Sequence, residues 1–247
     1  MKRTEILYGH HAVRAALARR PEDVLGLFVA KEGEDAGLAA VVAEAERQGI
    51  PVQAAHREAL DRMTEGGSHQ GVVLKRRAGP VRDEATLEEI LALPAPLLLM
   101  LDGVQDPRNL GACLRTAEAA GVAALVLPRD RAAGLSPSAY KVASGAAESV
   151  PVVTVTNLAR TLTTLGEAGV RRVGAAHDGA VSLYATALTG PLCLVLGGEE
   201  RGLRRLVREH CDEIARIPMA APAESLNVAT AAAVFLFEAV RQRATPA

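Results

Sequence analysis

The 247-residue sequence has no tryptophan and very few other aromatic residues. Aromatic residues make up 2% of the chain, whereas 49% of the residues are hydrophobic, so the core must be built from aliphatic side chains. Proteins that bind single-stranded nucleic acid by stacking its bases need exposed aromatic rings. The composition therefore argues against a stacking platform, and the large hydrophobic share argues against an intrinsically disordered chain.

Cysteine, excess charge and long apolar runs are also scarce. The three cysteines form no Cys-x-x-Cys pair and leave an odd number, which fits structural thiols in a reducing compartment. The net charge of -1 gives no basic excess of the kind that marks nucleic-acid binders. The apolar run at residues 94–101 is far shorter than the ~20 residues of a membrane span, and the start Met-Lys-Arg-Thr-Glu has no apolar signal region. We therefore expect a cytoplasmic protein without a membrane span.

A change of composition near residue 80 predicts two domains. Around residues 78–96 the chain passes through Ala-Gly-Pro-Val-Arg-Asp-Glu, a short helical stretch and Leu-Pro-Ala-Pro, which is typical of a linker. We predict a first domain over residues 1–78, a linker over residues 79–96 and a second domain over residues 97–247.

Hydrophobic periodicity predicts alternating helices and strands in both domains. In the first domain a helix opens at Tyr8-Gly9 with Ala12, Val13, Ala16 and Leu17 on one face, followed by strand 24–30, helix 36–48, strand 51–54, helix 57–63 and strand 71–75. The second domain reads as strand 97–101, helix 109–120, strand 123–127, a turn through 135–137, strand 151–155, helix 157–168, strand 172–176, strand 192–196, helix 203–209, strand 213–217 and a final helix at about 225–243. This order predicts a small α/β domain followed by a mostly parallel sheet covered on both faces. Ligands in such sheets bind at the carboxyl ends of the strands.

The first of three polar clusters follows the strand at residues 97–101. It runs from Asp102 through Asp106-Pro107-Arg108-Asn109-Leu110-Gly111, with Arg115 further along the predicted helix. If Asn109 caps that helix, Asn109 and Arg115 are six residues apart and do not share one face. Arg115 is flanked by apolar residues, so we expect it to be either functional or held in a buried structural salt bridge.

The second and third clusters follow the strands at residues 192–196 and 213–217. The second is rich in glycine and acids, Gly197-Gly198-Glu199-Glu200-Arg201-Gly202, which suits close approach to a ligand but equally suits a generic strand-to-helix turn. The third runs irregularly from Ile217 to Val228, and its exposed backbone groups can read an adenine edge. Ser225 within it is explained as simply by a helix N-cap.

Several common chemistries have no support. No dinucleotide fingerprint and no Gly-x-x-x-x-Gly-Lys-[Ser/Thr] phosphate loop is present, and no Gly-x-Ser-x-Gly nucleophile elbow. The six histidines show no metal-ligand spacing with a third partner, so we predict no metal site.

In their order and spacing, the three clusters resemble the motifs of the SpoU family of RNA ribose 2′-O-methyltransferases, part of the SPOUT superfamily of knotted methyltransferases. The matching segments are 106–111 with Arg115, 194–203, and 217–219 with 225–228. In the first domain, Tyr8-Gly9 with His11-Ala12-Val13 and His69-Gln70-Gly71-Val72 resemble the ribosomal-protein-like substrate-binding domain of members that modify 23S rRNA. With Arg208-Glu209-His210-Cys211-Asp212-Glu213, the chain is most similar to members that methylate a guanosine in the peptidyl-transferase region. Glu200 departs from the family, which often has glycine there.

The resemblance implies an rRNA-processing enzyme that uses S-adenosyl-L-methionine for 2′-O-methylation. The cofactor would be held bent by backbone groups around Gly197, Ile217 and Leu226, with Ser225 and Asn227 shaping the pocket. The family also implies a C-terminal trefoil knot and an obligate homodimer with the site near the interface. The RNA partner would be 23S rRNA or another structured RNA.

The resemblance further assigns roles to three side chains. Arg115 matches the residue proposed to act on the proton of the ribose 2′-hydroxyl, but a guanidinium has a pKa above ~12 and no acceptor while it is protonated. Clamping an RNA phosphate and orienting the hydroxyl is the alternative role. Asn109 matches the residue that holds Arg115 or the ribose, and Glu199 or an RNA phosphate would offset the charge of Arg115 beside the cationic sulfonium.

Local arginines are the candidates for the RNA-binding face, because the charges of the chain are otherwise evenly mixed. We select Arg14, Arg76 and Arg77 for this role.

Three alternatives stay open at this point. The enzyme could act on tRNA or on another rRNA nucleoside, and base choice is not readable from the sequence. A non-catalytic RNA-binding or ribosome-assembly protein on the same two domains is a second alternative, although the intact Asn109, Arg115, Glu199 and Asn227 argue against it. A nucleotide-dependent oxidoreductase has only the α/β pattern in its favour.

Overall fold

The computed structural model describes residues 4–31, 36–79, 82–199, 201–220 and 225–244. The chain divides into two compact units, which we call unit 1 (Met1–Pro80 with Leu135–Ser149) and unit 2 (Val81–Gly134 with Val150–Ala247). The predicted division into a first domain over residues 1–78, a linker over residues 79–96 and a second domain over residues 97–247 stays a prediction. By packing, residues 135–149 belong to unit 1.

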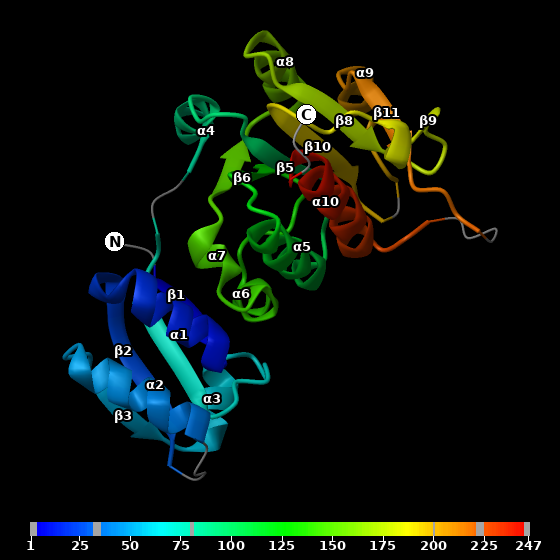
Figure 1. Cartoon of the computed structure of the whole chain (residues 1–247). Coiled ribbons are helices and arrows are strands. Elements are labelled where there is room, and N and C mark those ends of the chain that lie inside the picture. Colours follow the sequence, from blue (N-terminus) through cyan, green and yellow to red (C-terminus); the bar gives the residue numbers. More distant parts are fainter. Residues whose placement is uncertain (1–3, 32–35, 80–81, 200, 221–224, 245–247) are drawn as a thin grey trace. The chain divides into compact units, whose positions relative to one another are not determined.

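Unit 1 is built on a four-stranded sheet in the order β1-β4-β2-β3 (Figure 1). β1 and β2 both pair antiparallel with β4, and β3 runs parallel to β2. The strands are β1 (Thr4–Tyr8), β2 (Val24–Ala30), β3 (Val52–Ala55) and β4 (Val72–Arg77). The helices are α1 (His10–Arg19), the 3-10 helix η1 (Pro21–Asp23), α2 (Ala36–Arg47), α3 (Arg57–Met63), α6 (Pro137–Ala143) and α7 (Ala146–Ser149).

Most predicted elements of unit 1 are confirmed. The strand over residues 24–30 and the helix over residues 57–63 have the predicted bounds. α1 buries the four residues that we placed on one face, Ala12, Val13, Ala16 and Leu17. β1 and the two helices of residues 137–149 were not predicted. We predicted only a turn at Ser136-Pro137, but Ser136 Oγ accepts the N–H of Ala139 and Pro137 opens α6, because Ser-Pro serves a helix start as well as a turn.

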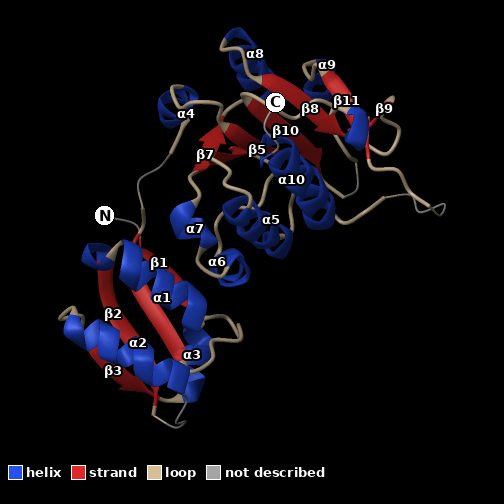
Figure 2. Ribbon diagram, in the orientation of Figure 1, coloured by secondary structure: helices blue, strands red, loops and turns tan. Residues whose placement is uncertain are grey.

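Unit 2 contains a seven-stranded sheet in the order β7-β6-β5-β10-β8-β11-β9, and the described neighbours pair in parallel (Figure 2). The strands are β5 (Leu97–Asp102), β6 (Ala124–Pro128), β7 (Val152–Val155), β8 (Arg171–Ala175), β9 (Val181–Ser182), β10 (Leu192–Gly197) and β11 (Glu213–Arg216). The helices are α4 (Glu84–Leu91), α5 (Pro107–Ala119), α8 (Leu158–Glu167), the 3-10 helix η2 (Leu183–Ala185), α9 (Arg205–Glu209) and α10 (Val228–Ala244). The predicted α/β class with a mostly parallel sheet is confirmed.

The core of unit 2 lies on both faces of this sheet. α4, α8 and α9 share one hydrophobic cluster with alternate residues of β5, β6, β7 and β10. α5 and α10 pack against each other, and α10 also contacts β10 (Figure 1). Every residue of β5 is buried, as expected for an apolar strand covered on both sides. Cys113 and Cys193 are both buried, and Cys193 belongs to this core. Burial also raises the pKa of the Cys113 thiol to about 12. We therefore regard both as structural thiols.

The strand order brings the ends of four strands together. β10 lies between β5 and β8, and β11 lies beside β8, so the loops after these four parallel strands leave the same edge of the sheet. Among the helices of the described residues, none has the length and apolar character of a membrane span.

Candidate cofactor and active site

Unit 2 has a cavity of about 520 Å³ at this edge of the sheet. Its walls come from the segments that follow β8, β10 and β11 and from the start of α10. All five predicted cofactor-binding residues line it: Gly197, Ile217, Ser225, Leu226 and Asn227. Glu199, which we predicted to act in catalysis, lines it as well. The structure thus brings together residues from two clusters that are separated by about twenty positions in the sequence.

Glycines shape the loop after β10. A Cβ atom on Gly197 would fall into the backbone of Gly202, and one on Gly198 would lie 2.5 Å from the carbonyl oxygen of Gly103. Gly198 and Gly202 form an antiparallel bridge, in which Gly202 N donates to Gly198 O at 3.0 Å. The loop therefore doubles back on itself before α9 begins at Arg205, and glycine is required where its two arms approach so closely. Glu200 and residues 221–224 lie outside the described residues.

Asp102 forms hydrogen bonds with residues at both ends of this loop. Its side chain is fully buried, its Oδ2 accepts the backbone N–H of Arg204 at 2.8 Å, and its Oδ1 accepts the Arg204 Nε–H at 2.5 Å. Its carbonyl oxygen accepts the N–H of Gly198 at 2.9 Å. Asp102 belongs to the first polar cluster, but we did not select it from the sequence as a site residue. The signal was there, because a carboxylate that ends an apolar strand needs a partner.

Asn109, Glu199 and Asn227 form a hydrogen-bonded group that we call the amide network. Asn109 Nδ2 donates to Glu199 Oε1, and Asn227 Nδ2 donates to Asn109 Oδ1 at 3.1 Å. Asn227 Oδ1 in turn accepts the N–H of Ala229 at 2.9 Å, so Asn227 rather than Ser225 caps α10. The network joins α5, the glycine loop and the start of α10.

The predicted cap of α5 is wrong, and the correction explains the amide network. Asp106 is the N-cap, and its Oδ1 accepts the N–H of Arg108 at 2.8 Å, while Pro107 occupies the first helical position. Asn109 is therefore inside the helix, and its amide is free to reach Glu199 and Asn227.

Arg115 lies on α5 but does not line the cavity. Its side chain is exposed, and within the described part of the chain it makes no hydrogen bond or ion pair, so the expected alternative of a buried salt bridge is wrong. Six helical positions separate it from Asn109, which turns it by about 120° around the helix axis. Its catalytic role stays a prediction.

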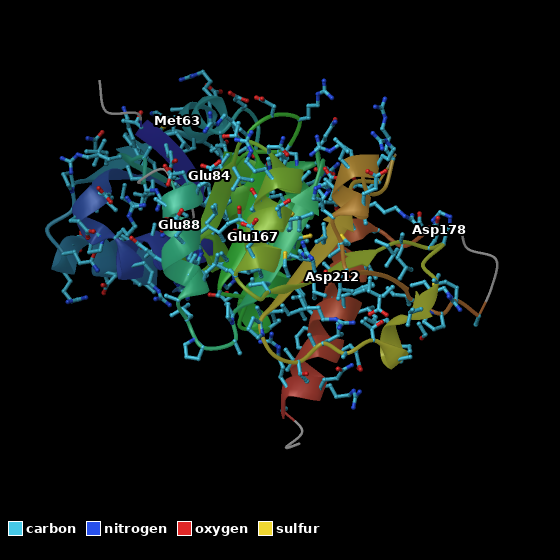
Figure 3. The ribbon with its side chains drawn as sticks, turned by 90° about the horizontal axis from the view of Figure 1, so that it is seen from above. Met63, Glu84, Glu88, Glu167, Asp178 and Asp212 are labelled. Carbon is cyan, nitrogen blue, oxygen red and sulfur yellow. The ribbon has the colours of Figure 1, made fainter. Side chains whose placement is uncertain are left out.

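Sequence reasoning missed a further wall of the cavity. His177 and Asp178, after β8, line it together with Arg208 of α9. Arg208 Nη1 donates to Asp178 Oδ1 at 2.8 Å, and this hydrogen bond holds the pKa of Asp178 below its usual value (Asp178 is labelled in Figure 3). The strand-end rule that selected the three clusters applies equally to Ala176-His177-Asp178-Gly179, so this wall was predictable.

One of the three predicted RNA-binding arginines is not available to RNA. The Arg76 side chain is 1% exposed and pairs with Glu5 Oε2 at 3.1 Å and with Glu148 Oε1 at 2.6 Å, while its guanidinium lies 5.1 Å from the centroid of the Tyr140 ring. We call this group the buried arginine cluster. It gives Arg76 a structural role and corrects the prediction. Strand alternation gives the reason, because Lys75 and Arg77 point to solvent and Arg76 to the other face of β4.

Arg14 and Arg77 are exposed, as an RNA contact requires. Arg77 Nη1 donates to Glu22 O at 3.0 Å, and Arg14 Nη2 lies 3.4 Å from Gly37 O. Both contacts leave most of each guanidinium at the surface. Among the described residues, no group of His, Cys, Asp and Glu is arranged to hold a metal ion.

Two family models match the chain. The SpoU rRNA Methylase family matches residues 96–237, and the model for RNA 2′-O ribose methyltransferase substrate binding matches residues 6–78. Curated relatives match over nearly the full length. The 23S rRNA (guanosine-2′-O-)-methyltransferase RlmB of Yersinia pestis is 52% identical over 97% of this chain and 98% of its own, and that of Escherichia coli K12 is 49% identical over 97% and 99%.

Solved structures agree with this assignment. The SpoU methyltransferase AviRb from Streptomyces viridochromogenes, in complex with the cofactor AdoMet, has a TM-score of 0.80 and 25% identity, covering 97% of this chain and 90% of its own. The AdoMet-bound rRNA methyltransferase from Sinorhizobium meliloti has a TM-score of 0.77 and 26% identity, covering 97% and 87%. The chain belongs to the SpoU rRNA methylase family.

Proposed function

We propose that this chain transfers a methyl group from S-adenosyl-L-methionine to the 2′-hydroxyl of a guanosine in 23S rRNA. The observation that carries the proposal is the cavity of unit 2, where the predicted cofactor residues and the amide network meet at one edge of the sheet. Relatives about 50% identical over 97% of the chain bear the name of that activity. The target within the peptidyl-transferase region rests on the resemblance of the motifs.

The residues of the cavity fit the cofactor. A volume of about 520 Å³ lies in the range of pockets for drug-sized ligands. Apolar side chains from Leu196, Ile217 and Phe235 line it beside the backbone of the glycine loop, which suits an adenosine held by main-chain groups. Glu199 and Asp178 add carboxylates, which suit a ligand with a positive sulfonium and an ammonium group. When bound there, S-adenosylmethionine supplies an electrophilic methyl group.

Side chains in and near the cavity take different roles in binding the cofactor and the RNA. The amide network fixes the Glu199 carboxylate at a defined point of the cavity wall, where it would offset the positive charge of a bound sulfonium. A guanidinium carries five N–H donors and no acceptor, so Arg115 clamps an RNA phosphate and orients the 2′-hydroxyl rather than taking its proton. Placement of the hydroxyl in line with the methyl group is the main source of rate. Arg14 and Arg77 contact RNA phosphates on unit 1.

We also propose a homodimer and a trefoil knot in the methyltransferase domain. The family resemblance supports both. The exposed Phe237 on α10 and the exposed Arg115 on α5, which has no partner among the residues that the structure describes, support the dimer, because these two packed helices then offer an apolar and a cationic group to a partner. Because ribosomal RNA is made and modified in the bacterial cytoplasm, the enzyme works there.

Transfer of labelled methyl from S-adenosylmethionine tests the function. Unmodified 23S rRNA fragments and tRNA transcripts are offered separately, and 2′-O-methyl positions are then mapped. Label in a domain V guanosine is the expected result. Label only in tRNA would overturn the substrate but keep the reaction. Cofactor binding without transfer to any RNA, assembled precursor particles included, would overturn the reaction and favour a non-catalytic RNA-binding protein.

A further inference from the structure

Unit 1 contains a second cavity, of about 600 Å³, that the proposed reaction does not use. It lies among β1, the turn after α3 and the segment that leads into α6. The residues that matter for its chemistry are Glu5, Tyr8, Thr64, Ser136, Ser138 and Tyr140, and Met63, labelled in Figure 3, contributes an apolar wall. All of them belong to unit 1.

Tyr8 presents an unpaired hydroxyl to this cavity. The residue is 5% exposed and its ring packs with Leu60 and Val73. Within the described part of the chain its hydroxyl has no hydrogen-bond partner, yet it is not one of the fully enclosed unpaired polar atoms, so it opens onto the cavity. A Cβ atom on Gly67 would lie 2.5 Å from the Tyr8 hydroxyl oxygen, so glycine at 67 keeps room for this group. A polar group in such a position is normally satisfied by a ligand or water.

Glu5 presents an acceptor to the same cavity. Its Oε2 accepts the Arg76 Nε–H at 3.2 Å and the Tyr140 hydroxyl at 3.4 Å, and it forms an ion pair with Arg76 Nη2 at 3.1 Å. Its Oε1 has no partner among the described residues. Arg76 lies behind the carboxylate and does not line the cavity. The buried arginine cluster therefore holds Glu5 in place while leaving one oxygen for a ligand.

The lining selects the chemistry of that ligand. The charged residues that line the cavity are Glu5 and Glu65, both acidic, and no lysine or arginine is among them, so a phosphate is disfavoured. A neutral group with N–H donors is favoured. Ser136 and Ser138, whose hydroxyl oxygens are 3.0 Å apart, add small groups that both donate and accept.

A nucleobase of RNA meets these demands, and guanine meets them best. RNA recognition commonly uses unpaired bases whose Watson–Crick edges are hydrogen-bonded by the protein. Of the four bases, guanine alone presents two adjacent N–H donors beside a carbonyl acceptor on that edge. We propose that the second cavity binds an unpaired guanine of the RNA substrate, with Glu5 Oε1 accepting from its N1–H and amino group and the Tyr8 hydroxyl donating to O6. This inference rests on the proposed function, because it takes RNA to be the substrate.

Binding of nucleosides to the full chain tests the proposal. Guanosine, adenosine, cytidine and uridine are each followed by saturation-transfer NMR, with the unit 2 cavity filled by S-adenosylhomocysteine. We expect guanosine to bind most tightly. Tyr8→Phe, which removes only the hydroxyl, should weaken guanosine binding roughly five- to tenfold, as expected for one hydrogen bond. Tyr184→Phe, at an exposed tyrosine of unit 2, is the matched control and should change nothing.

Equal binding of the four nucleosides, or guanosine binding that Tyr8→Phe leaves unchanged, would overturn the proposal. A thermal unfolding curve shows that Tyr8→Phe is folded, and Ser138→Ala gives a second variant of the same wall. The KM of methyl transfer for RNA should rise in Tyr8→Phe with kcat unchanged. The nucleoside experiment needs no methyl transfer, so a failure of the proposed function and a failure of this site give different results.

Discussion

The buried arginine cluster of unit 1 and the amide network of unit 2 are both polar groups that join distant segments, but they differ in burial. In the first, Arg76 and Glu148 are 1% and 3% exposed and form an ion pair. In the second, Asn109, Glu199 and Asn227 are neutral apart from one carboxylate and line or border an open cavity. A buried ion pair is stable only in the geometry that pairs its two charges, because any other geometry leaves an unpaired charge away from water. Amides beside water exchange partners at little cost, which suits a site that must accept a ligand.

The same contrast separates two arginines that the sequence presents alike. Both follow apolar stretches, Val72-Val73-Leu74 before Arg76 and Cys113-Leu114 before Arg115, and we expected Arg76 to contact RNA and Arg115 to be either functional or buried in a salt bridge. The structure buries Arg76 and exposes Arg115. We therefore expect Arg76 to affect stability and Arg115 to affect turnover.

Arg76→Ala should give the largest effect, because it leaves the buried carboxylate of Glu148 and the partly buried carboxylate of Glu5 without their partner. The expected loss is about 3–5 kcal/mol in the free energy of unfolding. Urea unfolding measures it through tyrosine fluorescence, since the chain has no tryptophan and two of its three tyrosines, Tyr8 and Tyr140, lie in unit 1.

Arg77→Ala, at the next position of β4, is the control and should cost almost nothing because Arg77 is exposed. Replacing Arg76 and Glu148 together by methionine should cost less than Arg76→Ala alone, because no unpaired charge then remains on Glu148. A loss below about 1 kcal/mol for Arg76→Ala would show that the cluster is worth no more than a surface pair.

Local sequence patterns predict which residues of one element are buried, but they do not predict which distant segments come into contact. Strand alternation separates Arg76 from its exposed neighbours Lys75 and Arg77, and the apolar run of β5 correctly predicted a strand buried on both faces. The contact of Asn109 with Glu199 joins positions 90 residues apart, and no local pattern fixes such a distance. The cap at Asp106 was misassigned because Asp-Pro-Arg-Asn offers two capping residues, and only the position of Pro107 in the first turn decides between them.

Arg115→Ala should reduce turnover by about a hundredfold or more if Arg115 orients the reacting hydroxyl. Its stability and the Kd for S-adenosylmethionine should stay unchanged, because Arg115 is exposed and outside the cavity. Steady-state kinetics and calorimetry measure the two. Arg160→Ala, an exposed arginine on α8, is the control. Unchanged turnover in Arg115→Ala would remove Arg115 from the mechanism.

Asn109→Ala should reduce kcat/KM by about tenfold, because it takes from Glu199 a hydrogen bond to a charged group. The amide of Asn227 also loses its acceptor, but Asn227 keeps its cap on Ala229. Asn157→Ala is the control that separates this loss of activity from a loss of stability. Asn157 caps α8, so its substitution should lower the free energy of unfolding by about 1 kcal/mol and leave the activity unchanged. Equal activity losses in both variants would show that the amide network acts only through the fold.

Glu238→Gln should give the smallest effect on stability. Glu238 is a carboxylate whose arginine partner faces water, so the pH dependence of this effect extends the contrast to a surface ion pair. Glu238 on α10 accepts from Arg241 at 2.7 and 2.8 Å and from Gln242 at 2.9 Å, and these hydrogen bonds lower its pKa to about 2 from 4.5. Because the pKa is lower in the folded than in the unfolded state, the stabilisation is complete above pH 4.5 and disappears as the pH falls toward 2. Arg241 is well exposed, so water and salt screen the pair, and we expect a Tm difference between wild type and variant of about 1–2 °C at pH 7. Thermal unfolding at pH 7, 5, 4 and 3 measures it, and the difference should shrink only below pH 5. A difference that stays constant to pH 3 would mean that Glu238 stabilises α10 by packing and not by its charge.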